Sequence, residues 1–356
     1  MTPPGRRARV LRGGVSVAVA AVLFVVVLPR VTGAHWAVVG ARLGRLGAGE
    51  ILLLTAVWCA GLACYATVLV ASVPGLRHAQ AVTVNVTGSA VSNLLPLGGA
   101  AGLATTFAML GSWGFPPATV ALSALVTGVW NVFAKLVLPL VALAGLLLAG
   151  DVATGRLAVG AAVGVAVLAV ALAVLAGTLT SERVARGVGR VLQAVGHAVL
   201  RLARSPRRLD WAHAVPARRH LVIDLVRVGW LRMTVGLIGF LGSQALLLYL
   251  SLHALGGSLG PAQVFAGYAF GRLLSTLPVT PGGVGVTETG VAGLLVALGS
   301  DGDTATSAVL LFSGFAFFAE FPAGAAGYVV WATRRSWRRP LAPPFPPAGL
   351  SPAGPR

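Results

Sequence analysis

Apolar runs long enough to cross a lipid bilayer constrain this chain more than any other feature. A helix that crosses the hydrocarbon of a bilayer needs about 20 apolar residues. Six crossings are expected, over residues 15–28, 51–72, 118–149, 157–179, 228–255 and 305–331. Hydrophobic residues make up 56% of the chain and charged residues only 10%, which excludes a water-soluble globular domain. The predicted fold is all-α, a polytopic helical membrane protein.

Proline and glycine interrupt the apolar sequence at residues 278–285, Pro-Val-Thr-Pro-Gly-Gly-Val-Gly. Proline removes helix hydrogen bonds, and glycine permits positive φ. Within hydrocarbon, broken backbone is tolerated only where protein buries it or a watery cavity receives it. The residues expected to line such a polar cavity are Pro281, Gly282, Gly283, Gly285 and Glu288. The alternative is an ordinary surface turn between two helices, although such a turn has no need of Glu288.

A second, weaker copy of this break lies at residues 92–102, Ser-Asn-Leu-Leu-Pro-Leu-Gly-Gly-Ala-Ala-Gly. Each Gly-Gly pair follows a proline and precedes a lone charge by a similar distance, 37 residues to Lys135 and 38 to Glu320. Interrupted apolar segments at matching places in two halves are typical of a transporter site near the membrane midplane. We therefore expect a pseudo-repeat with two re-entrant pairs of half-helices, near residues 81–110 and 261–298. The candidate site residues of the first pair are Asn93, Pro96, Gly98 and Gly99.

Three lone charges stand inside or beside the apolar runs: Lys135, the only lysine, Arg272 and Glu320. A charge within a membrane span is costly and marks a transport pathway or an ion pair. We count all three as candidate substrate-binding residues. For Lys135, snorkelling toward the membrane surface is the alternative. Because Lys135 and Glu320 each stand alone in an apolar helix, we also expect them to interact across the two halves.

The net charge of +18 lies almost entirely outside the apolar runs, so no nucleic-acid partner is expected. Arginine at the edges of membrane spans marks cytoplasmic loops. Nine arginines lie in residues 181–220, and others lie in residues 1–13 and after the last span. We therefore expect a cell-membrane protein with both termini and this loop in the cytoplasm, although three arginines between residues 30 and 45 weaken the argument.

The expected organisation has three parts. A basic cytoplasmic N-terminus precedes a membrane domain, and a basic, Pro-rich, disordered tail follows it. These parts cover residues 1–13, 14–332 and 333–356, and a basic cytoplasmic loop, 181–220, separates membrane halves 14–180 and 221–332. The basic start and first apolar run also fit a secretory signal peptide. A retained first helix is favoured because many more spans follow.

Cysteine and histidine give no sign of a metal site. Cys59 and Cys64 lie five residues apart in one apolar run, so on a helix they point about 140° away from each other. The six histidines show no metal-ligand spacing. No disulfide, metal or cofactor is expected.

The second break carries a family resemblance. Pro281-Gly282-Gly283-Val284-Gly285-x-x-Glu288, between an apolar helix and a Leu-rich one, resembles the signature of the lysylphosphatidylglycerol synthase transmembrane domain family. The first break is similar to the family's first-half motif, but Leu103 and Ala104 follow Gly102 where relatives often carry glutamate. The likeness extends over about residues 15–332. The soluble aminoacyltransferase domain of the full-length synthase is absent from this sequence.

The resemblance implies a flippase-like protein that moves an anionic or lipid-linked headgroup across the membrane. Membrane lipids are then its partners, with a lipid-modifying enzyme as a further expected partner, and the chain itself is not expected to be an enzyme. Two other classes stay open. An ion-coupled transporter of small solutes would use the same broken helices. An intramembrane transferase, or an accessory subunit that uses a lipid-linked substrate, would need paired carboxylates or a Ser/Cys–His arrangement at the breaks.

Overall fold

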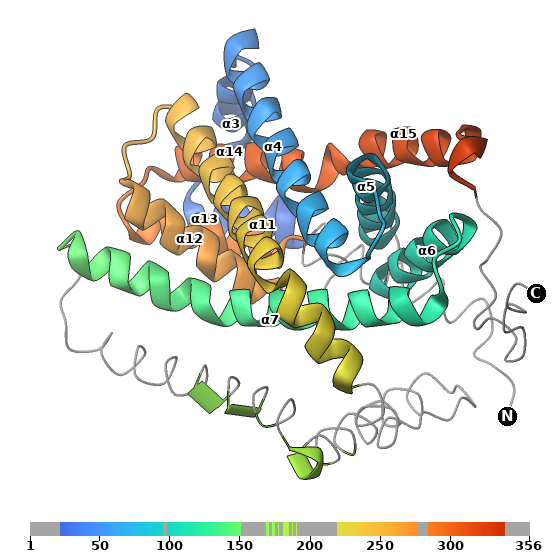
Figure 1. Ribbon diagram of the computed structural model, residues 1–356. Coiled ribbons are helices and arrows are strands. Elements are labelled where there is room, and N and C mark those ends of the chain that lie inside the picture. Colours follow the sequence, from blue (N-terminus) through green and yellow to red (C-terminus); the bar gives the residue numbers. More distant parts are fainter. Residues whose placement is uncertain are drawn as a thin grey trace, which may run out of the picture.

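The computed structural model of the chain describes residues 22–94, 98–150, 219–275 and 284–338, with scattered positions between 169 and 190. All regular structure in this part of the chain is helical (Figure 1). The principal helices are α2 (Leu28–Thr32), α3 (Trp36–Leu43), α4 (Ala48–Ser72), α5 (His78–Leu94), α6 (Gly98–Ser112), α7 (Pro117–Leu148), α11 (Arg219–Ala254), α12 (Pro261–Leu274), α13 (Val286–Ala297), α14 (Gly302–Ser313) and α15 (Glu320–Thr333). Short π-helices, η1 (Leu23–Val27) and η3 (Gly314–Phe318), and the 3-10 helix η4 (Arg335–Trp337) complete it.

Four helical segments in the described residues are long and apolar enough to cross a membrane. They are Ala48–Ser72, Pro117–Leu148, Leu225–Ala254 and Gly302–Thr333. They confirm four of the six predicted crossings. Of the other two predictions, half of residues 15–28 and most of residues 157–179 fall outside the described residues, as do most of the basic loop and the tail. The chain is a multi-pass helical membrane protein.

Helices α4 and α11 pack side by side at the centre of the molecule (Figure 1). Small residues allow this close approach. In lipid, where the hydrophobic effect does not drive helices together, such close packing stabilises their association. A Cβ on Gly236 would lie 2.8 Å from the Cys64 carbonyl oxygen, and one on Gly239 would lie 2.8 Å from the Cys64 sulfur. Cys64 therefore serves in the packing of α4 against α11.

Two pairs of shorter helices lie on opposite sides of this central pair, α5 with α6 and α12 with α13 (Figure 1). They contain 17, 15, 14 and 12 residues, which is fewer than a crossing helix needs. The predicted breaks in the apolar sequence therefore occur. Residues 95–97 and 276–283, at the breaks themselves, lie outside the described part of the chain.

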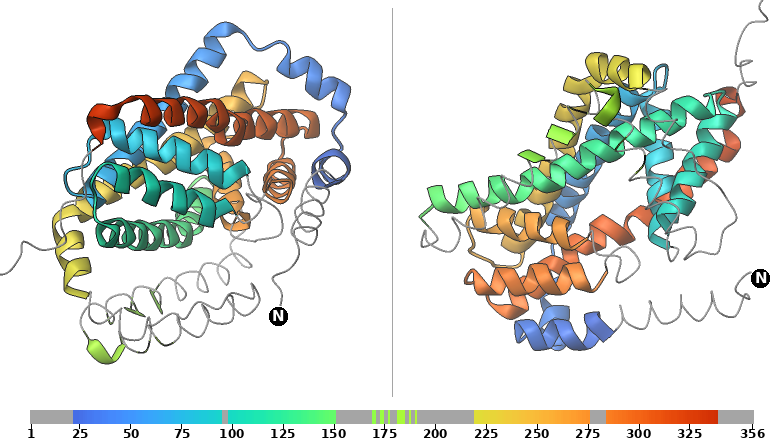
Figure 2. Two further views of the ribbon diagram at one scale, coloured as in Figure 1. Left: turned by 90° about the vertical axis from the view of Figure 1, so that its right-hand side faces the viewer. Right: turned by 90° about the horizontal axis from the view of Figure 1, so that it is seen from below.

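The last span is not a uniform α-helix, because the π-helix η3 separates α14 from α15. The Ala319 N–H donates to the Gly314 carbonyl five residues earlier at 2.8 Å. Pro322 explains why the helix loosens here, since it has no N–H to donate to the carbonyl of Phe318. Seen from the side in Figure 2, α15 runs along α5. A π-segment of this kind marks functional sites in many proteins.

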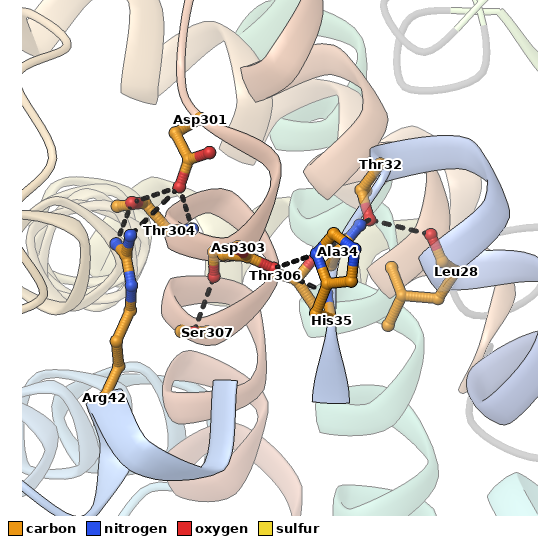
Figure 3. Close-up of polar contacts among 10 residues, drawn as sticks. All are labelled: Leu28, Thr32, Ala34, His35, Arg42, Asp301, Asp303, Thr304, Thr306 and Ser307. Atoms are coloured by element: carbon orange, nitrogen blue, oxygen red, sulfur yellow. Dashed lines mark hydrogen bonds and ion pairs between the residues drawn. The ribbon is translucent and has the colours of Figure 1, made fainter. Parts of the chain in front are cut away.

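Polar contacts join several helix ends at one side of the molecule (Figure 3). We call them the outer group, and the helix ends at the other side the inner group, after the orientation that the arginine distribution predicts. The Arg42 guanidinium donates to the Leu255 carbonyl at 3.3 Å and to the Thr304 hydroxyl, and it pairs with Asp301 at 3.2 Å. The His35 N–H donates to the Asp303 carboxylate at 2.5 Å. Hydrogen bonds from Thr304, and more weakly the Arg42 charge, hold the pKa of the Asp301 carboxyl below its usual value. These contacts fix α3 and the end of α11 to the start of α14.

An inner group forms at the other helix ends. The Ser72 and Ser123 hydroxyls hydrogen bond at 2.7 Å, which joins the end of α4 to the start of α7. The Trp331 indole donates to the Ser112 hydroxyl at 2.9 Å, so the end of α15 meets the end of α6. Trp113 packs against Trp337 edge to face with ring centroids 5.5 Å apart. Each long span thus has at least one end that side-chain contacts tie to a neighbouring element, and the span α14–α15 has both ends tied.

Candidate functional site

A cavity of about 290 Å³ lies between the two pairs of short helices, among apolar spans. Its lining comes from α4, α5, α7, α11, α12, α13, α14, η3 and α15. The polar lining residues are Tyr65, Asn85, Ser89, Asn93, Asn131, Gln244, Tyr268, Arg272, Ser275, Thr287 and Glu320. So many amides and hydroxyls around one space inside apolar helices make this the principal candidate site.

Helical spacing places most of these groups on one face of each short helix. On α5, Asn85, Ser89 and Asn93 recur every four residues and therefore line up. On α12, Tyr268 and Arg272 stand one turn apart in the same way. The last turn of each helix before a break therefore faces the cavity, through Asn93 on α5 and Arg272 on α12.

Arg272 has no partner for its charge in the described residues. The ion pairs there are His35–Asp303 and Arg42–Asp301, and the Arg272 Nε is buried with no hydrogen-bond acceptor. The Tyr268 hydroxyl and the Thr287 hydroxyl, on residues that also line the cavity, are buried without partners as well. A cation inside a membrane domain costs several kcal/mol unless an anion compensates it. The site is therefore electropositive on its α12–α13 side.

Glu320, the first residue of α15, also lines the cavity. One of its carboxylate oxygens accepts a hydrogen bond from the Asn93 amide at 2.7 Å, which joins α15 to the last turn of α5. The predicted interaction of Glu320 with Lys135 is wrong, because no ion pair joins them in the described residues. Asn93 satisfies the carboxylate instead, without neutralising it.

Lys135 does not line the cavity, although Asn131, one turn earlier on α7, does. Its side chain is half-buried, and its charge repels that of Arg272. Pro139 follows in the same helix and leaves the Lys135 carbonyl without its usual N–H donor. A role for Lys135 in substrate binding stays a prediction, with Arg272 as the cation that the cavity exposes.

Glu288 is 1% exposed and does not line the cavity. One of its oxygens accepts the Gly285 N–H at 2.5 Å, and the other accepts the Ser313 hydroxyl at 3.0 Å. Gly285 precedes α13 with a φ of +87°, a conformation that favours glycine. Glu288 thus caps α13 and holds it to α14. These bonds give the carboxylate a structural role, and a role for Glu288 in substrate binding stays a prediction.

The other predicted glycines and prolines fall into two sets. Gly98 begins α6 buried, so close to the Ser92 carbonyl that no side chain would fit. Gly99 is exposed with open space around it. The predicted residues outside the described part of the chain are Pro96, Pro281, Gly282 and Gly283. The structure therefore brings together Asn93, Arg272 and Glu320 from the predicted set.

One family model matches residues 13–324 of the chain, that of the lysylphosphatidylglycerol synthase TM region. The match covers most of the sequence and both breaks. The chain belongs to this family. No curated protein was found to match it.

Several residues of the cavity were missing from the predicted site of this family member. They are Tyr65, Asn85, Ser89, Asn131, Gln244, Tyr268, Ser275 and Thr287. Asn85, Asn131 and Gln244 carry a usable signal, since an amide is unusual in an apolar span and usually faces protein. Tyrosine, serine and threonine carry no such signal, because they are common in membrane helices.

Chemically, the cavity offers hydrogen bonds and two opposite charges held apart. Arg272, Glu320 and the α5 amides line the same cavity, so a ligand with an anionic group and a polar or cationic group finds a partner for each. Among the described residues, no three of His, Cys, Asp and Glu come together as metal ligands. Both cysteines are free, Cys59 exposed and Cys64 partly buried, and neither lines the cavity.

Proposed function

We propose that this protein translocates a membrane lipid with an anionic or lipid-linked headgroup, and that the headgroup passes through the polar cavity. The observation that carries the proposal is Arg272, a cation in the membrane domain with no anionic partner in the described residues. A phosphate oxygen compensates such a guanidinium through charge-assisted hydrogen bonds. Glu320 and the α5 amides then take an ammonium group or sugar hydroxyls.

The re-entrant arrangement belongs to this proposal. Asn93, one residue before the end of α5, contacts Glu320 near the middle of the span Gly302–Thr333. Glu288, in the first turn of α13, contacts Ser313 near the middle of the same span. Each break thus adjoins the middle of a crossing helix, which supports half-helices that enter and leave on one side. Helix ends at the breaks then present N–H groups to a headgroup.

In this proposal the protein acts as a transporter and forms no covalent bond with the lipid. Its partners are membrane lipids, together with an enzyme that modifies the transported lipid. The cytoplasmic placement of both termini follows from the arginine distribution. Transport of a free solute by the same cavity is the competing function, and dependence on the lipid part of the substrate separates the two.

Translocation in reconstituted vesicles tests the role of Arg272. The probe is phosphatidylglycerol with a fluorescent acyl chain. The measurement is the rate at which probe from the inner leaflet reaches the outer leaflet, where an impermeant external reductant quenches it. Arg272→Gln should slow translocation about ten- to 150-fold, since a hydrogen bond to a charged group contributes about 1.5–3 kcal/mol. Arg272→Lys, which keeps the charge, should retain part of the rate.

Arg232→Gln is the matched control, because Arg232 is exposed on α11 and does not line the cavity. It should translocate at the wild-type rate. Equal rates in a stably inserted Arg272→Gln variant and in the control would contradict the proposal. Uptake of soluble glycerophosphoglycerol into the vesicles, with no movement of the lipid, would indicate solute transport instead.

A further inference from the structure

A second hollow lies on the last span, on a different part of η3 from the polar cavity. It has a volume of about 440 Å³ and opens to the surface of the protein. Its lining is entirely apolar and consists of Leu43, Leu310, Leu311, Gly314, Phe315 and Ala319. We call this feature the η3 groove.

The η3 groove borders the middle of the last span, Gly302–Thr333, which is long and apolar enough to cross a membrane. Gly314 stands near the middle of the span Gly302–Thr333, far along the helix from the polar contacts of Asp301 and Thr304. Phe318, which follows in η3, is 61% exposed, so this part of the span faces outward. An apolar hollow that opens outward at this depth meets acyl chains rather than water.

The same five-residue segment borders both hollows. Gly314 and Phe315 line the η3 groove, whereas Ala316 and Phe317 line the polar cavity. The two hollows therefore lie against different faces of the same short helix. Glu320, at the cavity, follows Ala319, at the groove. A lipid that places its headgroup in the cavity has its acyl chains beside this segment.

We infer that the η3 groove binds an acyl chain of the lipid whose headgroup occupies the polar cavity. This inference rests on the proposed function and adds a lipid-binding element to it. The amphipathic ligand is held at two points. Its acyl chain lies in the apolar η3 groove, and its headgroup lies in the polar cavity. A headgroup without acyl chains lacks the first contact, so the groove makes the protein selective for lipids over the corresponding soluble molecules.

Gly314 permits a direct test, because a Cβ on it would meet nothing within 4 Å and a side chain there enters open space. Gly314→Leu should fill the groove without disturbing the helix. Gly128→Leu is the matched control, since Gly128 is a helical glycine on α7 that likewise has open space where a Cβ would lie. The full chain is reconstituted with phosphatidylglycerol that carries a photoactivatable diazirine midway along one acyl chain. Labelled peptides are mapped by mass spectrometry, and translocation is measured in parallel.

In the wild type, residues 310–319 should be photolabelled more strongly than the exposed stretch around Val329 of α15. Gly314→Leu should reduce both this labelling and translocation several-fold, and Gly128→Leu should change neither. Equal labelling around Val329 and in residues 310–319 would overturn the inference. Normal translocation by Gly314→Leu after its labelling has been lost would overturn it as well. Because labelling is read separately from transport, failure of the groove and failure of the Arg272 test are distinguishable.

Discussion

Glu288 and Glu320 both stand in apolar helices, but they are stabilised in different ways. Glu288 uses both oxygens on protein groups, the Gly285 N–H and the Ser313 hydroxyl. Glu320 accepts one hydrogen bond, from Asn93, and borders the cavity. A buried carboxylate with both oxygens satisfied has little capacity left for a ligand. At the residue scale, the first is suited to structure and the second to substrate.

This difference leads to a prediction for Glu288. Glu288→Gln keeps an oxygen that accepts the Gly285 N–H, so the variant should lose about 1 kcal/mol of stability and still translocate lipid. Glu288→Leu leaves the Gly285 N–H and the Ser313 hydroxyl unsatisfied, so it should be destabilised by a few kcal/mol. Thermal unfolding in detergent and the vesicle assay measure the two effects. Complete loss of translocation in a stable Glu288→Gln variant would return Glu288 to the transport mechanism.

At this scale the sequence predicts several residues that line the cavity but not all of their partners. Arg272 and Glu320 are predicted as lone charges, and Asn93 as part of the first break, and all three line the cavity. The expected Lys135–Glu320 interaction rests on two lone charges at similar distances from the two breaks. Spacing fixes the face of one helix but not the neighbour across from it, and here that neighbour is Asn93.

At the scale of elements, η3 is the feature that links the two hollows. Its π-geometry inserts an extra residue into one turn. Ala319 then lines the η3 groove, and the next residue, Glu320, lines the polar cavity. Pro322 favours this geometry because a regular α-helix would require its missing N–H. The span is therefore irregular where it borders the site.

Replacing Pro322 should restore the missing N–H and let α14 continue into α15 as a regular helix. Pro322→Ala is then expected to be at least as stable as the wild type, since proline costs about 3 kcal/mol within a helix. Its translocation rate should fall several-fold, because side chains beyond the π-turn rotate by about 100° per residue of register change. Thermal unfolding and the vesicle assay test this combination. A variant as active as the wild type would show that the π-turn is not needed.

The short helices could be predicted from sequence, whereas the π-turn could not. Proline and glycine clusters mark the ends of α5, α6, α12 and α13, and the observed helices end beside them. Pro322 stands as a single proline in an apolar run, which indicates a kink of some kind but does not specify its geometry. The small-residue contacts that fix neighbours, such as Gly236 against Cys64, depend on two helices at once.

At the scale of the whole molecule, the helix ends gather in two groups. Arg42, Leu255 and Asp301 meet in the outer group, and Ser72, Ser123 and Trp331 lie in the inner group. The predicted six crossings place the same segments together, because each crossing moves the chain to the other side. The arginine distribution, by contrast, assigns the inner group to the cytoplasm, and helix contacts carry no such information.

Cysteine labelling tests both assignments. Ser258, between α11 and α12 in the outer group, and Ser336, in η4 in the inner group, are exposed, and serine to cysteine changes little in size. Each is replaced by cysteine in a chain whose Cys59 and Cys64 are alanine. A membrane-impermeant maleimide added to intact cells should label Ser258→Cys and spare Ser336→Cys, with the opposite result in inside-out vesicles.

Two contrary outcomes have different meanings for the molecule. Labelling of Ser336→Cys alone in intact cells would reverse the orientation in the membrane and leave the two groups of helix ends intact. Labelling of both cysteines from one side would break the grouping, and with it the placement of both breaks near the middle of the span Gly302–Thr333. The proposed re-entrant arrangement, in which two half-helix pairs enter from opposite sides, would then lose its support. The proposed path of the headgroup through the polar cavity would lose its structural basis with it.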